Sequence, residues 1–159
     1  MQPVQTPDLE AHIDIDAAPG VVYGVVTDVA RTPEWSPVVK RSGWVGGATG
    51  PAPDARFVGY NRFNGFRWTR ECVVTEAEPG ARFSFSTLAK DGGEQTRWRY
   101  ALEPAGDGTR LTLSYEVVSL PRWVALARKM PGGAKTSARQ AAQNLDTSLA
   151  RIKELVEAD

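Results

Sequence analysis

The amino-acid sequence predicts an α+β protein. One curved antiparallel sheet of seven strands is expected to wrap around a long C-terminal helix, with two short helices after the first strand. Strand-like segments follow one another through short turns between residues 57 and 118, and residues 134–157 have helical periodicity. Consecutive strands joined by tight turns are typical of an antiparallel meander. A long amphipathic helix needs an apolar face against which to pack.

Size and composition limit the class of protein. The chain has 159 residues, which by the usual length of a domain predicts a single domain over residues 1–159. Hydrophobic residues make up 42% and charged residues 24%, as in ordinary globular proteins rather than disordered chains. The 19 basic and 19 acidic side chains balance, so no surplus of positive charge favours nucleic acid as a partner.

Cysteine and histidine are too scarce for several kinds of site. Cys72 and His12 are the only residues of their types, which excludes an internal disulfide and a Cys/His zinc site. No glycine motif for phosphates or dinucleotides is present, so we expect no cofactor and no metal. Apolar runs are too short for a membrane span. Residues 1–8 are expected to be flexible and lack the features of a signal peptide, and a cytoplasmic location is expected.

The N-terminal part of the chain predicts two strands and two short helices. Residues 9–16 alternate apolar and polar side chains, as a half-buried strand does. Pro19 suits the first turn of a helix, and valines recur after it at helical spacing. A second short helix is expected over residues 31–35, ending before Pro37, and residues 38–45 have the pattern of a strand.

The middle of the chain predicts a series of strands and turns. The expected strands are residues 57–63, 66–75, 82–88, 96–102 and 110–118. Asn64 and Gly65 separate the first two. This pair is the strongest short signal for a hairpin, because the tight turn needs a positive φ at both central residues. Glycine-containing turns separate the later strands.

The helix predicted over residues 134–157 has apolar residues at intervals of three and four. Its first half presents mainly small side chains to the sheet, namely Ala138, Ala141 and Leu145. Bulky aromatic residues share the inward phase of the strands. Small side chains opposite a curved sheet leave space, so we expect an internal cavity, where small molecules tend to bind. In the alternative, the rings fill this space themselves.

Several segments resemble the START-like (SRPBCC) superfamily, and most closely its polyketide cyclase/dehydrase branch. They are residues 15–23 (IDAAPGVVY) and 28–37 (DVARTPEWSP), followed by 55–61, 98–103 and 108–112. The resemblance extends over residues 9–157. It implies the helix-grip fold of START-like and Bet v 1-like proteins, with an internal hydrophobic cavity. Members of this superfamily bind lipids, hormones, polyketides and other apolar molecules. Some members are enzymes, and the resemblance transfers no catalytic residue to this chain.

These features predict a protein that binds an apolar or amphipathic small molecule, lipid-like or polyketide-like, in the cavity. The alternative is a polyketide cyclase/dehydratase-type enzyme acting in the same cavity. A protein-interaction module would need an exposed apolar patch, which the strand phases do not predict. The pattern fixes no oligomeric state. The expected ligand contacts are Trp35, Phe57, Asn61, Trp68, Arg70, Phe83, Phe85, Trp98, Tyr100, Leu113, Tyr115, Trp123, Ala141 and Leu145.

Polar residues in the inward phase are the candidates for orienting a ligand. Asn61 and Arg70 share the phase of the aromatic side chains, and a buried arginine needs a partner. That partner is an acidic or carbonyl-bearing ligand or, in the interpretation that we prefer, solvent or a protein carboxylate. As an enzyme, the protein would use Arg70, Asn61 or a tyrosine to polarise a carbonyl. Tyr100 and Tyr115 either orient a ligand through their hydroxyls or are core residues with one hydrogen bond.

Two tryptophans have alternative roles at the entrance of the cavity. Trp35 either stacks on a ligand or closes the end of the sheet. Trp123, with Leu126 and Met130, either forms a lid beside Gly132-Gly133 or belongs to a fixed helix.

The remaining candidates are expected to have structural roles. His12 lies in the outward phase of the first strand, and Cys72 is expected to be a small buried hydrophobe. The arginines at positions 97, 99 and 110 alternate with apolar residues and are expected on a solvated outer face beside acidic residues.

Overall fold

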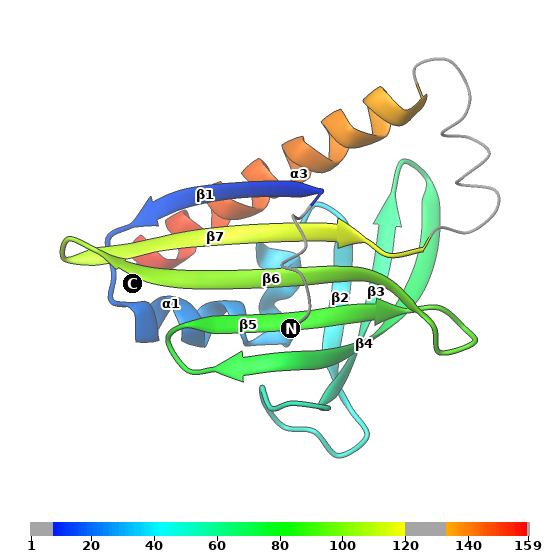
Figure 1. The fold of residues 1–159 in the computed structure, drawn as a ribbon, viewed down its shortest axis with the longest axis horizontal. Helices are drawn as coiled ribbons and strands as arrows, with labels where there is room; N and C mark the ends of the chain where they lie inside the picture. The colour runs from blue at the N-terminus through cyan, green and yellow to red at the C-terminus, as the bar shows by residue number, and fades with distance from the viewer. Residues whose placement is uncertain (1–7, 120–132, 159) are drawn as a thin grey trace, which may run out of the picture.

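The computed structural model describes residues 8–119 and 133–158, with the side chains of all of these except 133–137. The chain forms one antiparallel sheet with helices on one side (Figure 1). The strands are β1 (Leu9–Ile15), β2 (Val39–Val45), β3 (Arg56–Phe63), β4 (Phe66–Glu78), β5 (Arg82–Leu88), β6 (Glu94–Ala105) and β7 (Gly108–Val117). The helices are α1 (Pro19–Val26), the 3₁₀ helix η1 (Val29–Glu34) and α3 (Gly133–Glu157). In the described residues the sheet has seven strands in the order β1-β7-β6-β5-β4-β3-β2.

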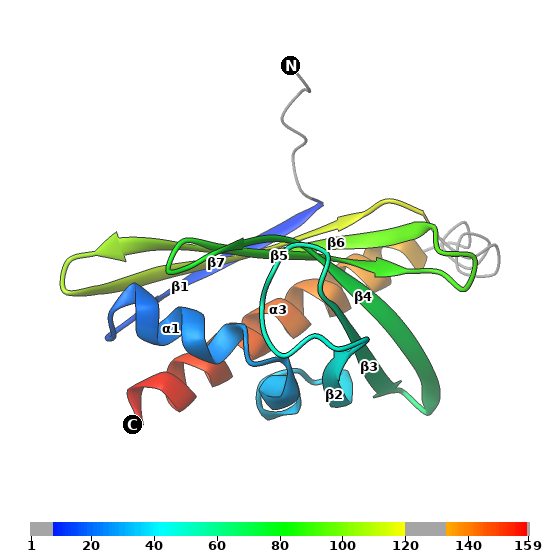
Figure 2. The same ribbon diagram turned by 90° about the horizontal axis from the view of Figure 1, so that it is seen from below.

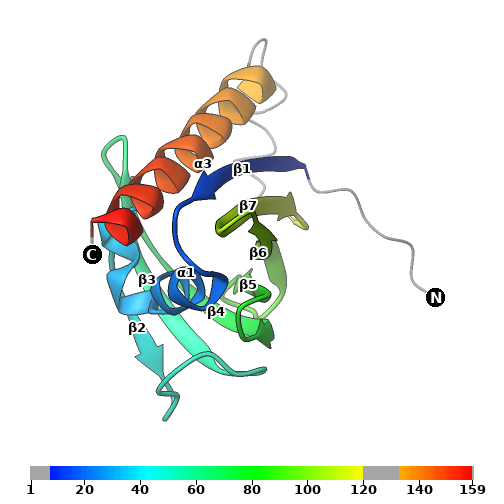
Figure 3. The ribbon, with the colours of Figure 1, turned by 90° about the vertical axis from the view of Figure 1, so that its left-hand side faces the viewer.

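The sheet is curved, and the helices lie on its concave side. Figure 2 shows α1 and α3 on the same side of the sheet, and Figure 3 shows the strands curling around that side from β1 to β2. Helix α3 contacts β1, β7 and α1. The predicted α+β fold, with seven strands and a long C-terminal helix, is confirmed. Within the described residues, no helix is long and apolar enough to cross a membrane.

Strands β4 and β6 are longer than the sequence pattern predicts. Strand β4 continues to Glu78 instead of ending at residue 75, because a bulge between Val74 and Glu76 shifts the alternation of side chains. Strand β6 continues to Ala105 through Pro104, which pairs with Thr109 in β7. Proline is rare inside strands, so the pattern predicted an earlier end.

Helix α3 has two halves that differ in their packing. Leu149, Ile152 and Val156 in the second half are buried in the core with residues of α1, β1 and β7. Burial of such a side chain stabilises the fold by about 2 kcal/mol. In the first half, Ala138 is exposed, which corrects its predicted inward position. The first turns of α3 extend past the end of β1, so no strand of the sheet covers them (Figure 1).

The outer face of the sheet carries ion pairs, as predicted for the arginines at 97, 99 and 110. Arg97 pairs with Glu94 at 2.6 Å, Arg99 with Glu76 at 2.7 Å, and Arg110 with Asp14 at 3.0 Å. His12 is exposed on the outward side of β1, as predicted.

The flexible N-terminus expected over residues 1–8 stays a prediction, and the structure describes only its last residue, Asp8. Asp8, which the sequence places in a flexible N-terminus, accepts a hydrogen bond from the backbone N–H of Val117 at 2.6 Å and is thereby attached to β7. Residues 1–7 lie outside the described residues, as do Trp123, Leu126, Met130 and Gly132 of the predicted lid.

Candidate functional site

A cavity of about 640 Å³ lies between the concave face of the sheet, the first half of α3 and the segment from α1 to β2. Every predicted ligand contact within the described residues lines it, and their contact with a ligand stays a prediction. They are Trp35, Phe57, Asn61, Trp68, Arg70, Phe83, Phe85, Trp98, Tyr100, Leu113, Tyr115, Ala141 and Leu145. The remaining predicted contact, Trp123, lies outside the described residues.

Aromatic rings form a continuous series across the inner face of the sheet. The strand register places Phe85 opposite Trp98, and Trp98 opposite Tyr115. The ring centroids of Trp98 and Tyr115 lie 4.6 Å apart, and those of Phe57 and Phe85 lie 5.0 Å apart. These tilted and edge contacts hold the rings against one another along the wall. The rings therefore line the cavity without filling it, which excludes the alternative of a solid aromatic core.

Helix α3 explains why space remains. Its side chains at the cavity are Ala141, Asn144, Leu145 and Ser148, which recur at intervals of three and four residues. Two of these four are polar, and sequence reasoning did not identify Asn144 or Ser148 as cavity residues. The sequence indicates these two residues only by their position, because they share the helical spacing of the apolar residues Ala141 and Leu145. Asn144 accepts a hydrogen bond from Nε2 of Gln140 at 3.0 Å through Oδ1.

Two threonines on adjacent strands add a polar strip to the wall, and sequence reasoning did not identify them either. Thr87 of β5 lies opposite Thr96 of β6, and their hydroxyl groups share a hydrogen bond. Nε1 of Trp98 donates to the hydroxyl oxygen of Thr96 at 3.2 Å. These contacts satisfy the indole N–H and fix the orientation of the Trp98 ring in the wall.

Asn61 presents an unsatisfied acceptor in this region. Its Oδ1 is buried and has no hydrogen-bond partner among the described residues. An unpaired buried polar group costs about 1–3 kcal/mol. The neighbouring inward position in β3 is Gly59, and a Cβ placed there would lie 3.3 Å from this oxygen. A side chain at Gly59 would therefore crowd Oδ1 of Asn61.

Arg70 lies opposite Gly59 across strands β3 and β4, and its half-buried side chain lines the cavity. Its guanidinium donates through Nη1 to the backbone oxygen of Thr69 at 3.4 Å. No carboxylate of the described residues forms an ion pair with Arg70, in contrast to the arginines of the outer face. A carboxylate of the described residues is therefore excluded as the partner of the Arg70 guanidinium.

Two titratable side chains in the cavity wall, Cys72 and Tyr100, are protonated at neutral pH. Burial raises the pKa of the Cys72 thiol to about 12, with the positive charge of Arg70 acting in the opposite direction. Burial also raises the pKa of Tyr100 to about 12, and a hydrogen bond with the Trp35 side chain opposes this shift. Cys72 is thus a buried hydrophobe, as predicted, and Tyr100 is a hydrogen-bonding core residue. Trp35 is only 1% exposed and forms part of the wall.

The described residues contain no group of His, Cys, Asp and Glu side chains suited to hold a metal ion. What the cavity does contain is an apolar wall with polar side chains at a few positions. A curved antiparallel sheet that holds a long C-terminal helix over such a cavity defines the helix-grip class of proteins, which includes START-like and Bet v 1-like proteins.

The chain belongs to the family described as "Polyketide cyclase / dehydrase and lipid transport", whose model matches residues 6–157. The chain is 30% identical to a polyketide-cyclase-like protein from Corynebacterium glutamicum, with a TM-score of 0.61. That comparison covers 94% of this chain and 90% of the other. Among curated proteins, none matches this chain.

More distant structures share the fold. A protein from Nitrosomonas europaea is 16% identical with a TM-score of 0.68, over 96% of this chain and 95% of the other. The di-domain ARO/CYC StfQ from the steffimycin biosynthetic pathway is 17% identical with a TM-score of 0.73. This match covers 94% of this chain and 50% of StfQ. At these identities the similarity demonstrates a common fold.

Proposed function

We propose that the protein binds an amphipathic small molecule, lipid-like or polyketide-like, in the cavity between the sheet and α3. The observation that carries this proposal is the pairing of an apolar aromatic wall with an unsatisfied acceptor, Asn61 Oδ1, near Arg70. A volume of about 640 Å³ is within the range of small-molecule sites. The single cysteine, unpaired and buried, supports the expected cytoplasmic location.

The two polar groups define the chemistry of the ligand's head group. Asn61 Oδ1 accepts hydrogen bonds, so the ligand supplies a hydroxyl or N–H donor there. The Arg70 guanidinium only donates, so the ligand supplies a carbonyl or carboxylate oxygen. A head group with a hydroxyl beside a carbonyl or carboxylate satisfies both residues. The remainder of the ligand is apolar and lies against the rings.

The first experiment identifies what the purified protein carries. Denaturing extraction followed by mass spectrometry is expected to recover an apolar molecule with an oxygenated head group. The second experiment uses 1-hydroxy-2-naphthoic acid as a probe and follows the fluorescence of the cavity tryptophans, Trp35, Trp68 and Trp98. We expect binding to weaken about tenfold in Arg70→Gln, because a charge-assisted hydrogen bond is lost.

Matched controls separate the head-group contacts from general effects. Arg110→Gln removes the same charge from the outer face and is expected to leave the affinity unchanged. 2-Naphthoic acid lacks the hydroxyl, so it is expected to bind the wild-type protein more weakly than 1-hydroxy-2-naphthoic acid does. It is expected to bind Asn61→Leu as tightly as it binds the wild-type protein. Recovery of no ligand, together with no binding of either naphthoic acid or of fatty acids, would overturn the proposal.

The second candidate function is a polyketide cyclase/dehydratase-type enzyme. The position of Arg70 in the cavity favours it, because a guanidinium stabilises negative charge that develops on a carbonyl oxygen. The described lining residues, however, include no Asp, Glu or His to accept a proton. Binding is therefore the better-supported function. If the protein is an enzyme, Arg70→Ala and Tyr115→Phe are expected to abolish turnover of a poly-β-ketone substrate while the fold survives, and full turnover in both would discard this mechanism.

A further inference from the structure

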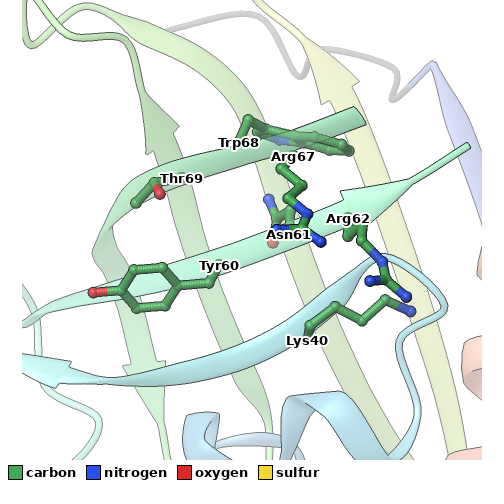
Figure 4. A pocket seen from close by; sticks show the side chains of 7 residues that line it. All are labelled: Lys40, Tyr60, Asn61, Arg62, Arg67, Trp68 and Thr69. Atoms are coloured by element: carbon green, nitrogen blue, oxygen red, sulfur yellow. The ribbon is translucent and has the colours of Figure 1, made fainter. Parts of the chain in front are cut away.

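A second hollow, of about 510 Å³, lies at the corner formed by β2, β3 and β4. Figure 4 shows the cationic side chains of Lys40, Arg62 and Arg67 around it, one from each of these three strands. Tyr60, Asn61, Trp68 and Thr69 complete its lining. We refer to Lys40, Arg62 and Arg67, together with Arg41, as the basic corner.

No carboxylate of the described residues pairs with the charges of the basic corner. None of its four side chains forms an ion pair with a described residue, whereas Arg56, Arg82, Arg97, Arg99 and Arg110 elsewhere on the sheet all do. Arg62 and Arg67 are also direct partners across β3 and β4. Like charges directly opposite each other destabilise a strand pair. The chain as a whole has no net charge, so this cluster is a local concentration of positive charge.

Exposed aromatic rings accompany these charges. Phe66 is 68% exposed and lies directly after the Asn64-Gly65 turn of the β3–β4 hairpin. Tyr60 is 42% exposed, and the guanidinium of Arg41 lies 4.3 Å from the centre of its ring. Phe66 is therefore a projecting apolar side chain whose neighbour in the sequence, Arg67, is a cation.

We propose that the basic corner and the tip of the β3–β4 hairpin dock the protein on an anionic lipid surface. In this arrangement Phe66 enters the interfacial region, and Lys40, Arg62 and Arg67 contact lipid phosphates. A dissolved anion would satisfy the cations but would leave the exposed ring of Phe66 without a role. An anionic layer above an apolar interior complements both features.

The position of the hairpin connects this surface with the cavity. Phe63, Asn64, Phe66 and Arg67 also line the cavity of about 640 Å³, so the hairpin forms part of both hollows. Docking through the tip would place this part of the cavity wall at the lipid surface. The docking proposal does not depend on which molecule the cavity binds.

The test is cosedimentation with vesicles of phosphatidylcholine alone or of an equimolar mixture of phosphatidylcholine and phosphatidylglycerol. Wild-type protein is expected to bind the mixed vesicles, and to bind them more weakly as salt is added. A basic side chain near an anionic surface strengthens binding about fivefold, so the Arg62→Gln and Arg67→Gln double variant is expected to lose about 25-fold. The double variant is expected to be as stable as wild type or more so, because it removes a like-charge pair.

Two matched controls accompany the variants. The Arg139→Gln and Arg151→Gln double variant removes the same charge from exposed positions on α3 and is expected to bind like wild type. Phe66→Ser is expected to weaken binding about tenfold through the loss of apolar burial. Its control is Val21→Ser, an exposed apolar residue of α1 at the opposite end of the molecule (Figures 1 and 2).

The following results would overturn the proposal. One is the failure of wild-type protein to bind mixed vesicles at low salt, and another is an equal loss of binding in the α3 double variant. Unchanged vesicle binding by Phe66→Ser would also reject insertion of the hairpin tip. If inorganic phosphate instead shifts the NMR signals of the Arg62 and Arg67 side chains while vesicles do not bind, the hollow serves a dissolved anion. Vesicle binding and naphthoic acid binding are separate measurements, so a failure of either proposal is recognisable.

Discussion

Gly59 of β3 lies directly opposite Arg70 of β4, and a Cβ at Gly59 would lie 3.3 Å from Oδ1 of Asn61. A side chain at this glycine would thus crowd Asn61, one of the two polar groups that define the proposed head-group site. Gly59 has an ordinary strand conformation, so its importance at this position is spatial rather than conformational. A substitution at Gly59 does not strain the backbone, so the site can be tested without disturbing the fold.

Gly59→Ala is expected to weaken binding of 1-hydroxy-2-naphthoic acid severalfold, because the new methyl group displaces Asn61 Oδ1 or the ligand. Folding stability is expected to stay equal or to increase by about 0.5 kcal/mol, since alanine lowers the entropy of the unfolded chain. The control is Gly43→Ala in β2, where a Cβ would meet no atom within 4 Å. Fluorescence titration and urea denaturation measure the two quantities, and equal affinities in the two variants would contradict the role of Gly59.

Ala141→Leu is expected to reduce the cavity and abolish binding of the probe without lowering the free energy of unfolding. The added side chain enters empty space, since Ala141 lines the cavity in the first half of α3. Its control is Ala150→Leu, an exposed position in the same helix with the same change in volume. Thermal denaturation and probe titration of both variants provide the comparison. Retained binding in Ala141→Leu would place the ligand elsewhere.

The phase of the side chains made most of the cavity wall predictable. Phe83, Phe85 and Trp98 have polar residues on both sides in their strands, and this alternation assigns one face of a strand to the interior. The Asn64-Gly65 turn was equally predictable, and both residues have positive φ angles, 51° and 82°. These features depend on local sequence, which a pattern records directly.

Features that depend on pairing across the sheet were not predictable in the same way. Lys40 lies where the register between β2 and β3 shifts, between Val39 and Arg41, so its phase in the sequence does not indicate which face it joins. The basic corner therefore becomes visible only in three dimensions. The absence of a described carboxylate beside Arg70 likewise depends on residues distant in the sequence.

Cys72 provides a prediction for the dependence of stability on pH. Its folded pKa of about 12 is above the ordinary value of 9.0, because burial disfavours the thiolate. The stabilisation of the folded state by the neutral Cys72 thiol is therefore fully present below pH 9. It is lost as the pH rises from 9 toward 12, because the thiol then ionises in the unfolded chain but not in the folded protein. The free energy of unfolding is expected to fall in this window with a slope approaching about 1.4 kcal/mol per pH unit from this group. Cys72→Ala is expected to remove that part of the slope in urea denaturation, and an unchanged slope would contradict the burial of the thiol.

Gly65 completes the hairpin that carries Phe66, and its φ of 82° is one that side chains rarely adopt. Gly65→Ala is expected to lower the free energy of unfolding by about 1 kcal/mol, because a Cβ clashes with the backbone in this left-handed conformation. Gly20→Ala in α1 is the control. It lies in helical backbone with open space around its Cβ, so the same substitution is expected to stabilise by about 0.5–1 kcal/mol. Opposite signs in urea denaturation would verify the left-handed turn. If Gly65→Ala stabilised the protein as Gly20→Ala does, the turn would have another conformation, and the position of Phe66 on which the docking surface depends would have to be revised.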